Sequence, residues 1–134
     1  MDKTDPIDTL ARTVWGESRG EGQEGMIAVA CVVINRVNQG GWWGDDVITV
    51  CLKPYQFSCW NEGDPNLPQL EAVTDADPIF TQCIMIAKNA IGGLLTDPTN
   101  GATSYYDRRM AKPPSWALDE QPCAMIGHHI FYKL

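Results

Sequence analysis

An acidic side chain at position 17 interrupts an otherwise apolar helix face. Apolar residues at the i, i+3, i+4, i+7 and i+8 spacing of a helix precede it: Ile7, Leu10, Ala11, Val14 and Trp15. Glu17 and Ser18 occupy the next positions on that stripe. A carboxyl group partly withdrawn from water is harder to ionise, which is the condition for a proton donor near neutral pH. Glu17 is therefore our candidate general acid; the alternative is a structural acid paired with Arg12, Arg19 or Arg36.

Two helices are expected to position Glu17. The first begins at Pro6, with Asp5 as its N-cap, and ends between Gly16 and Gly20. The second covers about residues 22–37 and is apolar on nearly every side, which predicts a place in the middle of the core.

The rest of the chain predicts shorter and less regular elements. Asp45 is the expected N-cap of a short helix, and residues 53–68 predict a long loop rich in aromatic side chains. A further helix begins at Pro78 and is closed by a glycine pair after residue 91. Residues 104–106 and 129–132 predict two short strands. These elements together predict an α+β fold that is mainly helical.

Length and composition predict one domain over residues 1–134. The chain has 134 residues, 44% of them apolar, and shows no repeat or long linker. Residues 1–20 lack a basic start followed by an apolar stretch, and the run from Met26 to Ile34 is far below the roughly 20 residues that span a bilayer. We therefore expect a monomer that does not insert into a membrane and is made in the cytoplasm without a signal peptide.

Cysteine usage and charge narrow the classes of partner. Five cysteines without a CxxC pair predict reduced thiols, with Cys51 and Cys59 the first candidates if a disulfide forms. A net charge of −7 disfavours nucleic acid and anionic membranes and leaves a neutral ligand, or one bound in a local cleft. His128 and His129 are adjacent strand residues that diverge, so we expect no metal, and no cofactor is indicated.

Four segments, in order along the chain, carry a family resemblance. They are LARTVWGESRGE at 10–21 with the following GMIAVA and VINRV, KPYQFS at 53–58, GATSYY at 101–106, and GHHIFY at 127–132. Together they resemble the SleB/CwlJ type of bacterial and phage cell-wall hydrolases over nearly the whole chain. The resemblance implies a lysozyme-like fold of the lytic transglycosylase type, with Glu17 as the catalytic acid and the Ser18 hydroxyl helping to orient it.

The predicted substrate contacts combine this resemblance with the residue types. They are Ser18, Glu21, Gln56, Phe57, Tyr105, Tyr106, Trp116 and His129. Each of these residues could instead have a purely structural role. Glu21 could stabilise the positive N-terminus of the second helix, Gln56 could stabilise its loop, and an aromatic ring could belong to the core. Tyr105 and Tyr106 point to opposite faces of a strand, so at most one of them faces the cleft.

The expected reaction is cleavage of peptidoglycan glycan strands between N-acetylmuramic acid and N-acetylglucosamine. Glu17 protonates the departing oxygen and then, as carboxylate, accepts the proton of the muramyl C6 hydroxyl, which gives a 1,6-anhydro end. The alternative is a hydrolytic muramidase with a second carboxylate, and its candidates are Glu21, Glu24, Glu62, Asp64 and Asp107. The resemblance favours a phage endolysin that acts on the wall in the periplasm after a holin releases it. The rival classes are a zinc amidase and a noncatalytic wall-binding or virion protein.

Overall fold

The computed structural model describes residues 1–134 and begins with the helix that carries Glu17. This helix, α1 (Pro6–Ser18), has Asp5 as its N-cap, and the Asp5 carboxylate accepts a hydrogen bond from the Ile7 backbone N–H at 2.9 Å. The predicted apolar stripe is buried, and Leu10 and Val14 are fully inaccessible to solvent. The predicted start, end and buried face of the first helix are therefore confirmed.

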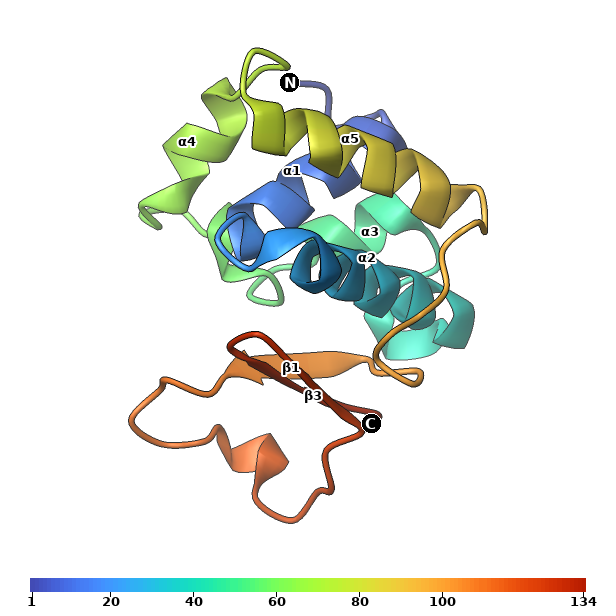
Figure 1. Ribbon diagram of the computed structural model, residues 1–134, viewed down its shortest axis with the longest axis vertical. Helices are drawn as coiled ribbons and strands as arrows, with labels where there is room; N and C mark the ends of the chain where they lie inside the picture. The colour runs from blue at the N-terminus through green and yellow to red at the C-terminus, as the bar shows by residue number, and fades with distance from the viewer.

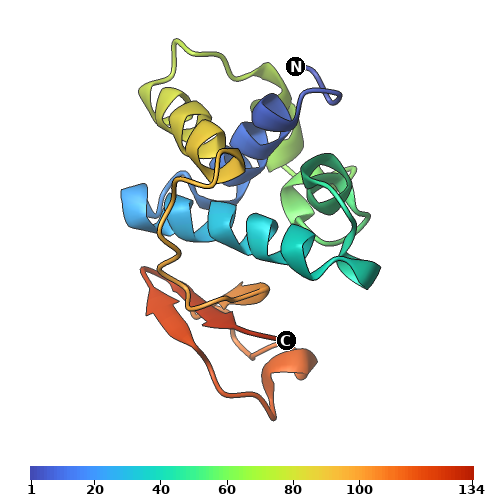
Figure 2. The same ribbon diagram turned by 90° about the vertical axis from the view of Figure 1, so that its right-hand side faces the viewer.

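Helix α2 (Gly22–Gln39) lies in the middle of the molecule. One part of its surface packs into the main core through Met26, Val29 and Val33. Another part, including Val32, packs on Phe131 of the sheet in a second apolar cluster. Figure 2 shows α2 between the other helices and the strands. The prediction that this helix is buried on several sides is confirmed.

The remaining helices complete the body around α1, and two of them differ from expectation. Helix α3 (Val47–Leu52) is capped by Asp46, whose carboxylate accepts from the Thr49 backbone N–H at 2.8 Å, so the expected cap at Asp45 is wrong by one residue. Helix α4 (Asn66–Ala72) begins inside the segment expected to be a loop. Helix α5 (Pro78–Ile91) matches its prediction. Three short 3-10 turns complete the elements: η1 (Gly41–Trp43), η2 (Ser58–Trp60) and η3 (Ser115–Ala117).

A three-stranded antiparallel sheet lies against one side of the helical body (Figure 1). Its strands are β1 (Ser104–Asp107), β2 (Ala124–Ile126) and β3 (His129–Tyr132), in the order β1-β3-β2. The central strand β3 pairs with both neighbours, and Tyr105 of β1 lies opposite Phe131. The two strands expected from the sequence are present, and β2 is an addition to them.

The core and the surface add two facts that bear on function. All five cysteines are free thiols, and Cys51 and Cys59 are both completely buried. None of the helices combines the length and the hydropathy that a membrane crossing needs.

Candidate active site

Glu17 lies in the last turn of α1, half-buried, and two hydrogen bonds hold its carboxylate. The Tyr105 hydroxyl donates to Oε1 at 2.6 Å, and the Cys59 backbone N–H donates to Oε2 at 3.3 Å. Tyr105 comes from β1 and Cys59 from η2, so the sheet and the helical body both hold the acid. The carboxylate is fixed in direction, as a group that transfers a proton to a bound substrate must be.

Gly16 allows the backbone of η2 to reach Glu17. A Cβ atom at position 16 would lie 2.9 Å from the Cys59 Cβ and 3.0 Å from a Leu70 methyl carbon, closer than side-chain carbons approach. Any larger residue would push η2 away from α1 and lengthen the hydrogen bond from Cys59 to Glu17. The residue before the acid is therefore glycine because a side chain at position 16 would collide with Cys59 and Leu70.

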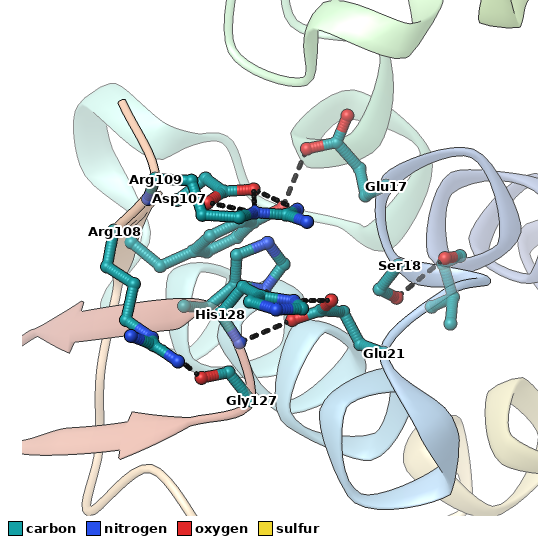
Figure 3. Close-up of polar contacts among 11 residues, drawn as sticks. Glu17, Ser18, Glu21, Asp107, Arg108, Arg109, Gly127 and His128 are labelled. Atoms are coloured by element: carbon teal, nitrogen blue, oxygen red, sulfur yellow. Dashed lines mark hydrogen bonds and ion pairs between the residues drawn. The ribbon is translucent and has the colours of Figure 1, made fainter. Parts of the chain in front are cut away.

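A cavity of about 310 Å³ opens in front of Glu17, and no apolar side chain lines it. Its lining consists of Gly16, Glu17, Ser18, Arg19, Gly20, Glu21, Asp107, Arg109 and His129. Glu17, Asp107 and Arg109, which are labelled in Figure 3, all line this cavity, which we call the polar cavity. Three carboxylates line it, and the number of them free to react decides the chemistry.

Glu21 has both carboxylate oxygens engaged by His128. The His128 backbone N–H donates to Oε1 at 2.7 Å, and His128 Nδ1 lies 2.8 Å from Oε2 (Figure 3). Burial alone would raise the pKa of Glu21, but these hydrogen bonds and the nearby His129 hold it below its ordinary value. The contact also explains Gly127, whose φ is +57° and whose Cβ would lie 2.8 Å from Oε1. Glu21 thus joins the start of α2 to the turn between β2 and β3.

Asp107 is the third carboxylate of the polar cavity, and Arg109 occupies both of its oxygens. Arg109 donates from Nε at 2.9 Å and from Nη2 at 2.6 Å. The guanidinium hydrogen bonds hold the pKa of Asp107 well below its ordinary value. The other second-acid candidates, Glu24, Glu62 and Asp64, do not line this cavity. Of the three carboxylates that line the cavity, Glu17 is therefore the one with no arginine or histidine side chain bound to it.

His129 lies in the wall of the polar cavity behind Tyr105. It is 6% exposed, its ring centroid is 4.7 Å from that of Tyr105, and its Nδ1 has no hydrogen-bond partner. Burial lowers the pKa of His129 although Glu21, Asp107 and Glu17 act in the opposite direction. Burial and the Glu17 carboxylate raise the pKa of Tyr105 well above its ordinary value, so the hydroxyl keeps its proton as a donor. No three His, Cys, Asp or Glu side chains are grouped so that they could hold a metal ion.

A second hollow of about 410 Å³ has Tyr105 in its lining. Aromatic side chains dominate its lining, and we call it the aromatic groove: Arg36, Trp42, Trp43, Tyr55, Gln56, Ser104, Tyr105, Trp116 and Leu134. Tyr105 therefore lines the groove and also donates its hydroxyl to Glu17. The predicted contact residues Gln56, Tyr105 and Trp116 meet in this groove, whereas Glu21 and His129 line the polar cavity.

Three predicted contact residues differ from expectation: Phe57 and Tyr106 line neither hollow, and Ser18 lines the polar cavity but makes no hydrogen bond to Glu17. Phe57 is 2% exposed and belongs to the main core, so it holds the loop and cannot touch a ligand. The Ser18 hydroxyl donates to the Val14 carbonyl at 2.7 Å, so Tyr105 rather than Ser18 orients Glu17. Tyr106 packs behind Trp116, with ring centroids 6.0 Å apart. Of the two adjacent tyrosines, Tyr105 lines the aromatic groove and Tyr106 does not, which agrees with the expectation that at most one faces the cleft.

Several groups of the site were not among the predicted contacts. They are the Cys59 backbone N–H, Arg19, Asp107 and Arg109. A backbone donor has no sequence signature of its own. Asp107 was only one of five candidate second acids, and its pairing with Arg109 two residues later is the one local signal that could have marked it.

The fold and the site together define a lysozyme-like protein, a helical body with a small sheet and a single unpaired acid at a helix end. Comparison with known proteins gives its family. The family model described as Cell Wall Hydrolase matches residues 20–132, a range that begins just after Glu17. The chain therefore belongs to the Cell Wall Hydrolase family.

Relatives of known sequence and structure agree with this assignment. The spore cortex-lytic enzymes of Oceanobacillus iheyensis and Bacillus subtilis are 34% and 33% identical to 95% and 93% of this chain. The chain spans only 41% and 36% of their lengths. The catalytic domain of the Bacillus cereus SleB protein has a TM-score of 0.75 at 30% identity, covering 96% of this chain and 89% of the solved one. The catalytic domain of the germination-specific lytic transglycosylase SleB from Bacillus anthracis has a TM-score of 0.74, also at 30% identity, with coverages of 96% and 93%.

Proposed function

We propose that this chain, as one catalytic domain, cleaves peptidoglycan glycan strands between N-acetylmuramic acid and N-acetylglucosamine and leaves 1,6-anhydromuramyl ends. The observation that carries the proposal is the state of the three carboxylates in the polar cavity. Glu21 and Asp107 are each held by a cationic or imidazole side chain, and Glu17 alone faces the cavity without one. The Bacillus anthracis neighbour is itself described as a lytic transglycosylase.

The proposed reaction uses Glu17 twice. Its carboxyl proton goes to the glycosidic oxygen, the bond from that oxygen to the muramyl C1 breaks, and the bonding electrons leave with the oxygen. The C6 hydroxyl of the same muramyl ring then bonds to C1, and its proton returns to the Glu17 carboxylate. The Tyr105 hydroxyl fixes Oε1 throughout, which leaves Oε2, with its longer hydrogen bond, to carry the proton.

An internal hydroxyl competes well with water because it is already tethered at high effective concentration. A hydrolytic muramidase would need a second carboxylate to hold the attacking water. Glu21 was our first candidate for that role, and its engagement by His128 argues against it.

Digestion of purified sacculi in heavy-oxygen water tests the proposal. We expect muropeptides with unlabelled anhydro ends, each lighter by one water than a hydrolytic product. Labelled, reducing ends would instead establish a hydrolase, and cut stem peptides would establish an amidase or peptidase. A chelator control separates a zinc enzyme from one that depends on Glu17.

The biological setting is a separate part of the proposal. The relatives from Oceanobacillus iheyensis and Bacillus subtilis are named for the spore cortex, while the expected endolysin role, with a holin for release, stays a prediction. Spore cortex and vegetative sacculi should therefore be digested side by side.

A further inference from the structure

His129 is a buried histidine with an unpaired ring nitrogen. The residue is 6% exposed, and its Nδ1 is buried and has no hydrogen-bond partner. Glu21 Oε1 lies 3.9 Å from this nitrogen, which is too far for a hydrogen bond. A buried polar atom without a partner is destabilising, and native proteins contain few of them. An unpaired imidazole nitrogen beside a carboxylate therefore needs an explanation.

The sheet places His129 against the tyrosine that holds the acid. Tyr105 lies opposite Phe131 in the register of β1 and β3, and His129 is on the same face of β3 as Phe131. The centroid of the imidazole ring is 4.7 Å from that of Tyr105 and 6.1 Å from that of Phe131. The Tyr105 ring thus packs on both side chains while its hydroxyl donates to Glu17. A displacement of the imidazole ring changes the support of that hydroxyl.

Charged and titratable groups face His129 from every element packed against it. They are Glu17 of α1, Glu21 at the start of α2, Tyr105 and Asp107 of β1, Arg109 after β1, and His128 of the preceding turn, which contacts Glu21. Burial lowers the pKa of His129, whereas the three carboxylates act in the opposite direction. The imidazole ring is therefore neutral near pH 7 and takes up a proton only below pH 6.5.

We propose that His129 is a proton-sensitive positioning residue, which in its neutral form supports Tyr105 so that the tyrosine hydroxyl aligns the Glu17 carboxylate. When the imidazole is protonated, both of its nitrogens are donors. Glu21 Oε1 accepts one hydrogen bond from the His128 backbone and can accept a second from His129 Nδ1. Shortening the 3.9 Å separation to a hydrogen bond moves the ring by about 1 Å. A misplacement of that size at a catalytic group is enough to lower the rate.

The proposal rests on the proposed function and gives it a pH dependence that one acid alone lacks. Cleavage that needs a protonated Glu17 declines as pH rises, but it has no reason to decline as pH falls. Loss of the alignment by Tyr105 adds a decline on the acidic side, below pH 6.5. The profile of kcat against pH is therefore bell-shaped, and its acidic side belongs to His129.

The pH profile of kcat tests this assignment, because the chain has only two histidines. Kinetics on soluble glycan strands are measured between about pH 5 and 8, the range in which histidine titrates. His129→Phe keeps a ring that cannot take up a proton. His129→Gln is a second nontitrating variant that keeps polar atoms, so the test does not depend on one exchange. His128→Gln is the matched control, because it removes the other imidazole of the chain.

In the unmodified protein, protonation of His129 is expected to lower kcat about tenfold with little change in KM, as loss of the Tyr105 hydroxyl does. Both His129 variants should lack this acidic decline, and His128→Gln should keep it. Tyr105→Phe should lack it too, because His129 then has no hydroxyl to align. An acidic decline that persists in both His129 variants, or that disappears in His128→Gln, would overturn the proposal.

Nuclear magnetic resonance separates failure of this proposal from failure of the proposed function. The two imidazole signals are assigned with the histidine variants, and the Tyr105 ring carbon that bears the hydroxyl is assigned with Tyr105→Phe. Without substrate, we expect the Tyr105 signal to shift with the same midpoint as the His129 imidazole. A Tyr105 signal that does not follow His129 would overturn the positioning role even if glycan ends are released. Coupled signals in a protein that releases no glycan ends at any pH would keep the coupling and remove the proposed function.

Discussion

The proposed chemistry depends on one proton of Glu17. In Glu17→Gln the side-chain oxygen can still accept the Tyr105 hydroxyl, and the size is unchanged, but the titratable proton is gone. We expect release of glycan ends to fall by at least about 100-fold, a modest share for a general acid, with an unchanged circular dichroism spectrum. Undiminished turnover by a folded Glu17→Gln protein would falsify the assignment.

Tyr105 is a positioning residue for this acid. Tyr105→Phe removes the donor to Glu17 but keeps the ring that packs on Phe131 at 5.5 Å between centroids. We expect kcat to fall about tenfold with little change in KM, since a fixed carboxylate matters most in the transition state. Tyr132→Phe is the control, because it removes a hydroxyl from the same sheet without touching Glu17. Equal losses in the two variants would show a general effect on the sheet.

The buried thiols make a separate prediction. Burial raises the pKa of Cys51 to about 12 and raises that of Cys59 as well, so both thiols are protonated and unreactive near neutral pH. We expect activity and melting temperature to be the same with and without dithiothreitol, and Cys51 and Cys59 to resist alkylation in the native protein. A melting temperature that drops in reductant would reveal a bridge between these two cysteines.

At the scale of elements, Glu21 links the start of α2 to the turn between β2 and β3. Its side chain is 7% exposed and accepts two hydrogen bonds from His128. Glu21→Ala is expected to lower the free energy of unfolding by about 1.5–3 kcal/mol, the usual range for a hydrogen bond to a charged group. Chemical denaturation measures this change, and Glu24→Ala, an exposed acid of the same helix end, is the control.

The pKa values of His129 and Glu21 predict how the stability of the protein depends on pH. Burial lowers the pKa of His129, so the unfolded chain binds that proton more readily and stability declines as pH falls below 6.5. The hydrogen bonds from His128 outweigh burial and lower the pKa of Glu21, so its contribution is present above pH 4.5 and is lost below it. Melting temperatures should decline in both ranges, and Glu21→Ala should reduce the decline below pH 4.5 without abolishing it, because the pKa values of Asp97 and Asp107 are lowered as well.

Elements with local start and stop residues could be predicted from the sequence, and the others could not. Helix α5 has Asp77 and Pro78 at its start, and its prediction was right. Helix α4 was missed because Pro65 and Pro68 suggested a loop, although proline is tolerated in the first turn of a helix. Strand β2 has three residues and pairs only with β3, so it depends on a partner that no local pattern reveals.

At the scale of the whole molecule, the negative charge predicts that activity depends on the anionic polymers of the wall and on salt. A net charge of −7 repels anionic wall polymers, and salt screens that repulsion over about 10 Å at 0.1 M. We expect activity on walls that carry teichoic acids to rise with moderate salt, and activity on walls stripped of these polymers to change little. A fall with salt on both substrates would indicate that local positive charges control binding.

The sequence could indicate the candidate acid, but not the groups that hold its carboxylate. Glu17 was marked by its place on a buried helix stripe. Its partners Tyr105 and Cys59 lie 88 and 42 residues away along the chain, and His128 lies 107 residues from Glu21. Such contacts arise from the packing of the sheet against the helices, and they leave no spacing pattern in one sequence.

The strand order has a consequence for synthesis on the ribosome. Strand β3 is the last element of the sheet to be made, yet β1 and β2 pair only with it. Until residues 129–132 leave the exit tunnel, β1 has no partner strand, and Tyr105 cannot be held against Glu17. The candidate active site is therefore complete only after β3 has emerged.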